Sequence, residues 1–232
     1  MRPFFRTLTI GLGLLVGLTP IRAEEKESVS PETKRAIEKM GGKVTERPLK
    51  ALSISVTLDP ITDEDLATLT NDLKRIKNLQ LYLGGPKLTD AGIGSLKDYT
   101  SLHTLRLSSP AVTDVGLKES LMGLKNLQSL MLPCAKLTDK GLAGIKGMAD
   151  LRLLALRGTA VTDAGLKELA GLKKLEALYL GETNFTDAAV KELKELKSLQ
   201  SLQLDKTGIT DAGVEELKEA LPTCRITRQE RD

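Results

Sequence analysis

The sequence predicts an α/β solenoid, an open stack of short helix–strand units with parallel strands on one side and helices on the other. The first observation behind this prediction is a Thr-Asp pair that recurs along the chain. Successive threonines of these pairs are 27, 24, 25, 24, 24 and 24 residues apart. A fixed period in this range is typical of stacked repeats, each too small to bury its own apolar face. The seven pairs begin at Thr62, Thr89, Thr113, Thr138, Thr162, Thr186 and Thr210.

The second observation is the leucine spacing within one unit. Leu166, Leu169 and Leu172 recur among charged residues, and this spacing predicts a helix with a solvated outer face. Leu178 and Leu180 follow with one residue between them, which predicts a short strand with one buried face. Helices pack 8–10 Å apart and strands 4.7–4.9 Å apart, so a stack of such units must curve with its strands inside.

The Thr-Asp pair has a structural explanation at the start of each helix. The hydroxyl of Thr162 is predicted to accept a hydrogen bond from an N–H of the first turn, and Asp163 lies where the helix dipole favours negative charge. A column of aspartates also suggests calcium, which binds several carboxylates together. The capping role accounts for every aspartate, and the Gly-rich calcium-binding repeat is absent, so we predict no metal site.

The repeated unit resembles the leucine-rich repeat family in its 24-residue form, written LxxLxxLxLxxTxVTDAGLxxL. The resemblance covers about residues 61–226 and implies a right-handed horseshoe with parallel strands on the concave side and helices on the convex side. It also implies a protein that acts by binding, usually to another protein through the concave face. The units are similar to repeats attached to eukaryotic F-box proteins. The chain has no F-box-like module, and residues 1–23 form the export leader described below, so the resemblance indicates a secreted bacterial relative. One unit shows the pattern in Leu172, Leu175, Leu178, Leu180, Thr183, Thr186 and Asp187.

Residues 1–23 have the pattern of a secretory signal peptide. Arg2 and Arg6 precede an apolar run from Leu8 to Leu18, and Ala23 is followed by a charged segment. The apolar run is about half the ~20 residues that span a bilayer, so cleavage after Ala23 is favoured over a retained anchor. We therefore expect an exported protein, periplasmic or secreted, without stable membrane insertion after cleavage.

The remaining chain divides into three parts. Residues 24–60 are expected to form a charged segment and an N-terminal cap, with a helix between Ser30-Pro31 and Gly41-Gly42 and strands at 43–45 and 52–58. Residues 61–226 form the solenoid of about seven units. Residues 227–232 form a charged C-terminal tail.

The charge of the chain excludes two classes of partner. The formal net charge is +3, from 34 Lys and Arg against 31 Asp and Glu. Arg2, Arg6 and Arg22 lie in the leader, which has no acidic residue, so the rest of the chain is neutral. A neutral chain offers no sustained positive field, so we expect neither nucleic acid nor an anionic membrane as partner.

The candidate binding residues occupy the strand positions between the buried leucines, which face the inside of the arc. Tyrosine and arginine are typical interface anchors, so Tyr82, Arg106, Arg157 and Tyr179 are the best contact candidates. The alternative is that these side chains only decorate a solvated sheet. The predicted partner-binding set is Tyr82, Arg106, Met131, Arg157, Tyr179 and Gln203.

The two cysteines and the histidine lack the neighbouring side chains that a disulfide, a catalytic site or a metal site requires. Cys134 and Cys224 lie four coils apart, about 19 Å at the strand spacing, beyond the reach of a disulfide, so both are predicted to be free thiols. His103 has no second histidine or cysteine nearby to complete a catalytic or metal site. We expect no cofactor.

The repeats and the export leader leave three possible functions to compare. The first is a non-catalytic, extracytoplasmic module that binds a protein or peptide through its concave face, as a monomer. The alternative is a structural or self-associating envelope component without a discrete ligand. An enzyme is not supported, because the sequence has no nucleophile with its base and no cofactor loop.

Overall fold

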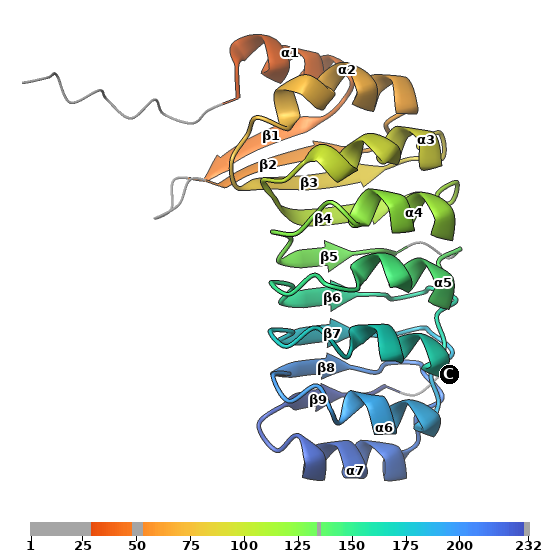
Figure 1. The fold of residues 1–232 in the computed structure, drawn as a ribbon. Coiled ribbons are helices and arrows are strands. Elements are labelled where there is room, and N and C mark those ends of the chain that lie inside the picture. The colour runs from red at the N-terminus through yellow and green to blue at the C-terminus, as the bar shows by residue number, and fades with distance from the viewer. Residues whose placement is uncertain (1–28, 48–52, 134–135, 230–232) are drawn as a thin grey trace, which may run out of the picture.

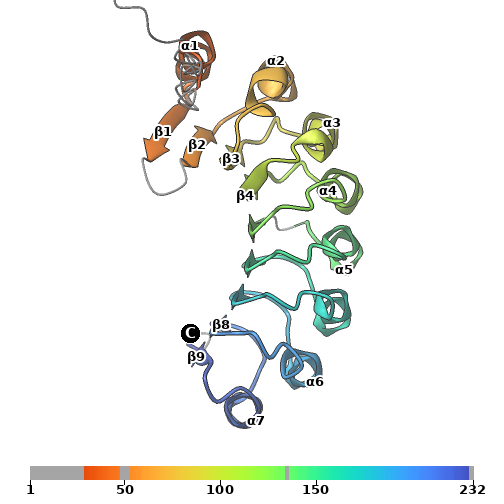
Figure 2. The same cartoon turned by 60° about the vertical axis from the view of Figure 1, so that its left-hand side comes forward.

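The computed structural model describes residues 29–47, 53–133 and 136–229. The predicted signal peptide, the charged segment 24–28, Cys134 and the last three residues of the tail lie outside these ranges. Within them the chain forms an open, curved stack with strands on the concave side and helices on the convex side (Figures 1 and 2). The predicted α/β leucine-rich repeat solenoid is therefore confirmed.

The described strands form one sheet in chain order. The pair β1–β2 is antiparallel, and every later pair is parallel. From β5 onward each strand has only three residues, because the chain must leave the sheet at once to complete its 24-residue circuit. The strands are β1 (Lys43–Arg47), β2 (Ser53–Leu58), β3 (Leu79–Gly84), β4 (Leu102–Ser108), β5 (Ser129–Met131), β6 (Leu153–Ala155), β7 (Ala177–Tyr179), β8 (Ser201–Gln203) and β9 (Arg225–Thr227).

The convex side mixes short α-helices with 3₁₀-helices. The helix expected at Leu166 and Leu169 is present and is a 3₁₀-helix. Its leucines repeat every three residues, which is the period of a 3₁₀-helix and keeps them on one buried face. The helices are α1 (Pro31–Lys39), α2 (Asp63–Leu73), α3 (Asp90–Ile93), η1 (Gly94–Asp98), α4 (Asp114–Leu121), α5 (Asp139–Leu142), η2 (Ala143–Ile145), η3 (Asp163–Leu169), η4 (Asp187–Ala189), α6 (Val190–Leu193) and α7 (Asp211–Ala220).

The core runs unbroken along the stack and is filled mainly by leucine. The central leucine of each short strand, such as Leu130, Leu154 and Leu178, is fully buried. Threonines at the turn after the strand are also buried, but each hydroxyl donates to a carbonyl three residues earlier, as Thr159 does to Leu156 at 2.7 Å and Thr207 to Leu204 at 2.8 Å. The buried Ser109 at the same turn donates to the carbonyl of Leu88 at 2.6 Å. These hydrogen bonds satisfy polar groups that would otherwise be costly to bury.

The Thr-Asp pairs form a ladder of hydrogen bonds between neighbouring repeats. Each aspartate accepts two hydrogen bonds from the threonine of the next repeat, one from its backbone N–H at 2.7–2.9 Å and one from its hydroxyl at 2.5–2.8 Å. Both carboxylate oxygens are therefore engaged by the fold. The pairs are Asp63–Thr89, Asp90–Thr113, Asp114–Thr138, Asp139–Thr162, Asp163–Thr186 and Asp187–Thr210.

The threonines also cap the helices, with one departure from the prediction. Thr62, Thr89, Thr113, Thr138, Thr186 and Thr210 each accept a hydrogen bond from an N–H of the first turn. Thr162, on which the capping prediction was based, makes no such bond. Its hydroxyl instead donates to Asp139 at 2.7 Å. All six Asp–Thr pairs thus share the hydrogen bonds between repeats, whereas the N-cap hydrogen bond is missing at Thr162.

Both ends of the ladder are closed by substitute groups. Thr62 has no aspartate before it in the stack, and Asp65 of its own helix accepts from its N–H at 3.1 Å and its hydroxyl at 2.8 Å. At the other end, Asp211 accepts from the guanidinium of Arg228, which also donates to the carbonyl of Ile209 at 3.1 Å. Helix α1 and strand β1 lie beyond the first repeat at the N-terminal end of the stack (Figure 2).

Candidate functional site

The concave face of the sheet brings five of the six predicted contact residues into one row, and Arg157 lies outside this row, two residues after Ala155. Strand register places Tyr82 beside Arg106, Arg106 beside Met131, and so on to the last strand. The flanking leucines point into the core and are buried, so the row itself points away from the core. We call this set the central row: Tyr82, Arg106, Met131, Ala155, Tyr179 and Gln203.

A second row lies two residues earlier on each strand, and together the two rows form an apolar patch. Leu153 and Ala177 are register partners, as are Ala155 and Tyr179, and Met131 precedes Ala155. All five side chains are partly exposed. We call these residues the apolar patch. They lie on β5, β6 and β7, at the middle of the concave face, where no packing role keeps them apolar.

A hollow of about 130 Å³ lies next to the patch, where β2, β3 and β4 end. Arg106 is exposed there, and its guanidinium has no ion-pair partner within the described residues. Asp59 also lines the hollow and packs on Gly84, where a Cβ atom would lie 2.5 Å from the Asp59 Cγ. The hollow is lined by Thr57, Asp59, Tyr82, Leu83, Arg106 and Ser108.

The other predicted arginine is already paired. Arg157 donates two hydrogen bonds to the carboxylate of Glu182, at 2.8 and 3.2 Å. This pairing lowers the pKa of Glu182 and raises that of Arg157, and Lys206 lies 3.9 Å from the same carboxylate. Arg157 is therefore less available for a partner than Arg106. The sequence offered a weak signal for this pair, since the two residues are about one repeat apart.

Gln203 and the acidic groups near it are also engaged. The side-chain amide of Gln203 donates to Asp205 at 2.5 Å, and the backbone N–H of Gln229 donates to the same residue at 2.9 Å. On the opposite border of the patch, Arg152 pairs with Glu176. In the C-terminal half of the concave face, the charges of Arg157 and Glu182 and those of Arg152 and Glu176 thus neutralise each other, whereas Asp205 is held by neutral donors.

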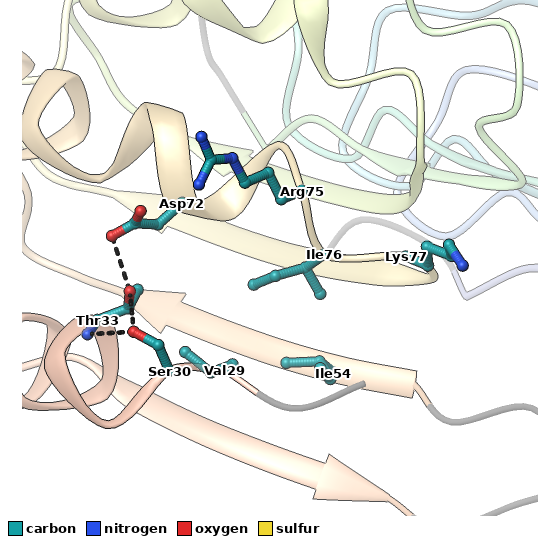
Figure 3. Close-up of a pocket in the computed structure, with 8 residues that line it drawn as sticks. All are labelled: Val29, Ser30, Thr33, Ile54, Asp72, Arg75, Ile76 and Lys77. Carbon is teal, nitrogen blue, oxygen red and sulfur yellow. Dashed lines mark hydrogen bonds between the residues drawn. The ribbon is translucent and has the colours of Figure 1, made fainter. Parts of the chain in front are cut away.

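The described residues contain a second cavity away from the concave face (Figure 3). It has a volume of about 220 Å³ and lies between α1, β2 and the end of α2. On one wall, the hydroxyl of Thr33 donates to Asp72 at 2.7 Å and lies 2.9 Å from the hydroxyl of Ser30. These bonds tie α1 to α2, so the polar groups of this cavity serve the attachment of the N-terminal helix.

The other groups weighed from the sequence have structural surroundings. The His103 ring Nδ1 lies 2.8 Å from the carbonyl oxygen of Ser101. Cys224 carries a free, half-buried thiol, and burial raises its pKa. In the described part of the chain, no three His, Cys, Asp or Glu side chains are grouped to hold a metal ion. Nor is any described helix long and apolar enough to cross a membrane.

Two exposed apolar side chains on the convex side were missed by sequence reasoning. Val115 and Met122 are 64% and 57% exposed, and they lie in and just after α4. The extra residue of this repeat, visible as its spacing of 25, lengthens the helix and brings Met122 to the surface.

Comparisons with known proteins agree with this architecture. Residues 195–218 match the family model described as Leucine Rich repeat. An internalin C2 from Listeria monocytogenes has 24% sequence identity and a TM-score of 0.56, over 75% of this chain and 80% of that chain. An internalin (inlF) from the same organism has 17% identity and a TM-score of 0.41, over 77% and 67% of the two chains.

A comparison with curated proteins gives no match. The internalin C2 likeness rests on the stacked repeats and supports the fold. Together with the family match over residues 195–218 and the strand register, this likeness shows that the chain has a leucine-rich repeat fold.

Proposed function

We propose that the protein is a non-catalytic binding module that holds a protein or peptide partner on its concave face. The observation that carries this proposal is the apolar patch on β5, β6 and β7. Its side chains are partly exposed although the leucine core behind them already stabilises each repeat. Apolar and aromatic residues at the centre of a surface, with polar and charged residues around them, are the usual anatomy of a protein interface.

Export is the second part of the proposal. It is supported by the pattern of residues 1–23, in which a basic start precedes an apolar run and a small residue stands at the cleavage point. N-terminal sequencing of material recovered outside the cytoplasm should begin at Glu24. A chain that begins at Met1 in that fraction would contradict cleavage.

The binding proposal is tested by affinity capture from the exported fraction. The parent protein is compared with a variant that carries Tyr82→Ala, Arg106→Ala and Tyr179→Ala. A matched control carries Val115→Ala, Lys140→Ala and Met122→Ala on the convex side, where the same number of exposed side chains is lost. We expect a stoichiometric partner to be recovered by the parent and by the convex control but lost from the concave variant.

Circular dichroism shows whether the three proteins are equally folded. If the concave variant is folded and captures the same partner as the parent, the concave face is not the binding site. A structural, self-associating role would instead appear as a mass that rises with protein concentration in light scattering.

A further inference from the structure

We infer that the partner segment is an extended peptide that carries an acidic side chain two residues from an aliphatic or aromatic side chain. This inference rests on the proposed function and specifies the chemistry of its ligand. It follows from the acidic side chains of the concave face that already have internal partners, and from Arg106, which has no ion-pair partner in the described part of the chain.

The acidic side chains that border the apolar patch already have partners within the protein. Glu176, Glu182 and Asp205 accept hydrogen bonds from Arg152, Arg157 and Gln203, respectively. A basic ligand group at these positions would have to displace an internal partner. An acidic ligand group would have no free cation to meet there.

Arg106 differs from the other cations beside the patch. It lies in the central row directly next to Met131 of the patch, and it has no ion-pair partner in the described part of the chain. A guanidinium can hold a carboxylate through two parallel N–H···O bonds, which gives geometric specificity as well as affinity. Arg106 is therefore the cation beside the patch that is left to meet a ligand. The exposed Lys43 on β1 and Arg225 on β9 lie at least two strands away from the patch.

The sheet geometry fixes the spacing between the two contacts. Arg106 is on β4 and Ala155 is on β6, two strand steps away, which is about 10 Å at the usual strand spacing. Met131 of the patch lies one strand step from Arg106, at about 5 Å. An extended peptide advances about 3.3 Å per residue, and its successive side chains point to opposite faces. In a segment lying across the strands, an acidic side chain over Arg106 and an apolar side chain over the patch would therefore be two residues apart, which is about 7 Å.

Asp59 supplies an internal check on this charge assignment. It lines the same hollow as Arg106 and is exposed, but it makes no ion pair with it. Its carboxylate would repel an acidic ligand group, so Asp59→Asn should strengthen the binding of an acidic peptide. The same substitution should weaken the binding of a basic peptide.

The experiment uses a phage-displayed library of twelve-residue random peptides selected on the purified protein and, separately, on Arg106→Glu. We expect the parent to enrich peptides with Asp or Glu two residues from an aliphatic or aromatic residue. The Arg106→Glu protein should enrich Lys or Arg at that position instead. Lys140→Glu makes the same charge reversal on the convex side, where Lys140 is exposed, and should select the same peptides as the parent.

Fluorescence anisotropy with one enriched peptide then gives affinities. We expect Arg106→Glu to weaken binding by about 30-fold or more, in line with losses at close interfacial charge pairs. Leu153→Ser should weaken it by about tenfold through the lost apolar contact. Asp59→Asn should strengthen it, and Lys140→Glu should leave it unchanged.

The outcomes separate this inference from the proposed function. Enriched peptides without acidic residues, whose binding is lost in Tyr179→Ala, would overturn the inferred ligand chemistry and keep the concave site. Peptides whose binding survives every concave substitution would overturn both. A library that yields no enriched sequence on the parent would overturn the inference, and the capture experiment would still test the proposed function on its own.

Discussion

The aspartate of each repeat joins its neighbour through two charge-assisted hydrogen bonds. A carboxylate that accepts from both a backbone N–H and a hydroxyl satisfies two donors at once, and such bonds are stronger than those between neutral groups. Their loss leaves two donors without a partner in a partly buried position, which costs more than the bonds themselves contribute.

Asp139→Ala should therefore lower the free energy of unfolding by about 2–3 kcal/mol. It removes both acceptors of Thr162, which has no cap bond of its own. Asp150→Ala is the matched control, because Asp150 is an aspartate on the surface of the same unit that only pairs with Lys174. Denaturant unfolding should show a large shift of the midpoint for the first variant and little for the second. Equal shifts would mean that the ladder is not a stabilising element.

The hydroxyl of Tyr99 differs from the ladder aspartates, because the surrounding described residues do not satisfy it with a hydrogen bond. Its side chain is fully buried in a core position, and its hydroxyl makes no hydrogen bond of normal geometry to the described residues. Burial raises the pKa of Tyr99 above its ordinary value of 10.0, although the Thr70 side chain partly offsets the increase.

Tyr99→Phe should raise the free energy of unfolding by about 1 kcal/mol, because it removes the cost of burying the hydroxyl. The pKa is higher in the folded state, so the protonated tyrosine favours folding below pH 10 and this contribution is lost as the pH rises further. The advantage of the phenylalanine variant should consequently widen above pH 10. Thermal unfolding at pH 7 and pH 10.5 measures both effects, and an advantage that stays constant between them would contradict the raised pKa.

At the scale of the element, the short convex helices depend on their neighbours. Most have three to five residues, too few to be stable alone, so their position is set by the ladder and by leucine packing. In five repeats a glycine two residues after the Thr-Asp aspartate lies against the aspartate of the previous repeat and permits this close approach. A Cβ atom at Gly165 would lie 2.4 Å from a carboxylate oxygen of Asp139. Ala189 occupies the same position in one repeat, so a small shift of the backbone can accommodate a methyl group.

Arg228 tests how the last element is held. Arg228→Ala removes the group that satisfies Asp211 and the carbonyl of Ile209 at the C-terminal end. We expect faster amide hydrogen exchange in α7 and β9, with protection of β3 to β7 unchanged. Exchange that rises equally in all strands would show that Arg228 stabilises the stack as a whole.

The central row could be predicted because it depends only on periodicity. Residues between two strand leucines must face away from the core, and a constant repeat length keeps Tyr82, Arg106 and Tyr179 in register. The pairing of Arg157 with Glu182 could not be predicted in the same way, since Glu182 lies in a turn with a positive φ of 59°. Turn geometry is not set by the repeat.

The hydrogen-bond ladder between repeats could not be predicted from the sequence either, for a different physical reason. Both of its residues have a sufficient local role, Thr162 as a cap and Asp163 as a favourable charge at a helix start. Only the three-dimensional stack shows that the aspartate reaches the next repeat. The spacing of Leu166, Leu169 and Leu172 predicts a helix but not its type, because a spacing of three fits both an α-helix and a 3₁₀-helix.

At the scale of the whole molecule, each repeat contacts only its neighbours, so stability is the sum of repeat and interface contributions. A cavity in the middle removes packing on both sides of a repeat. Leu154→Ala should lower the free energy of unfolding by about 3 kcal/mol, whereas Leu217→Ala in α7 should let the terminal repeat unfold first. Denaturation followed by far-UV circular dichroism distinguishes them, since the second variant alone should show a broadened transition.

The curvature of the stack gives the two faces different roles. The convex side carries the short helices, and the concave side carries the apolar patch with Arg106 beside it (Figure 2). We therefore predict that a partner contacts the concave side of a repeat and not the convex side.

Site-specific photo-crosslinking tests this claim most directly. A photoreactive amino acid is placed at Ala155 on the concave side or at Ala164, an exposed residue on the convex side of the next unit. We predict a crosslinked partner from position 155 and none from position 164. Crosslinks of equal yield from both positions, or from position 164 alone, would contradict a function based on the concave face.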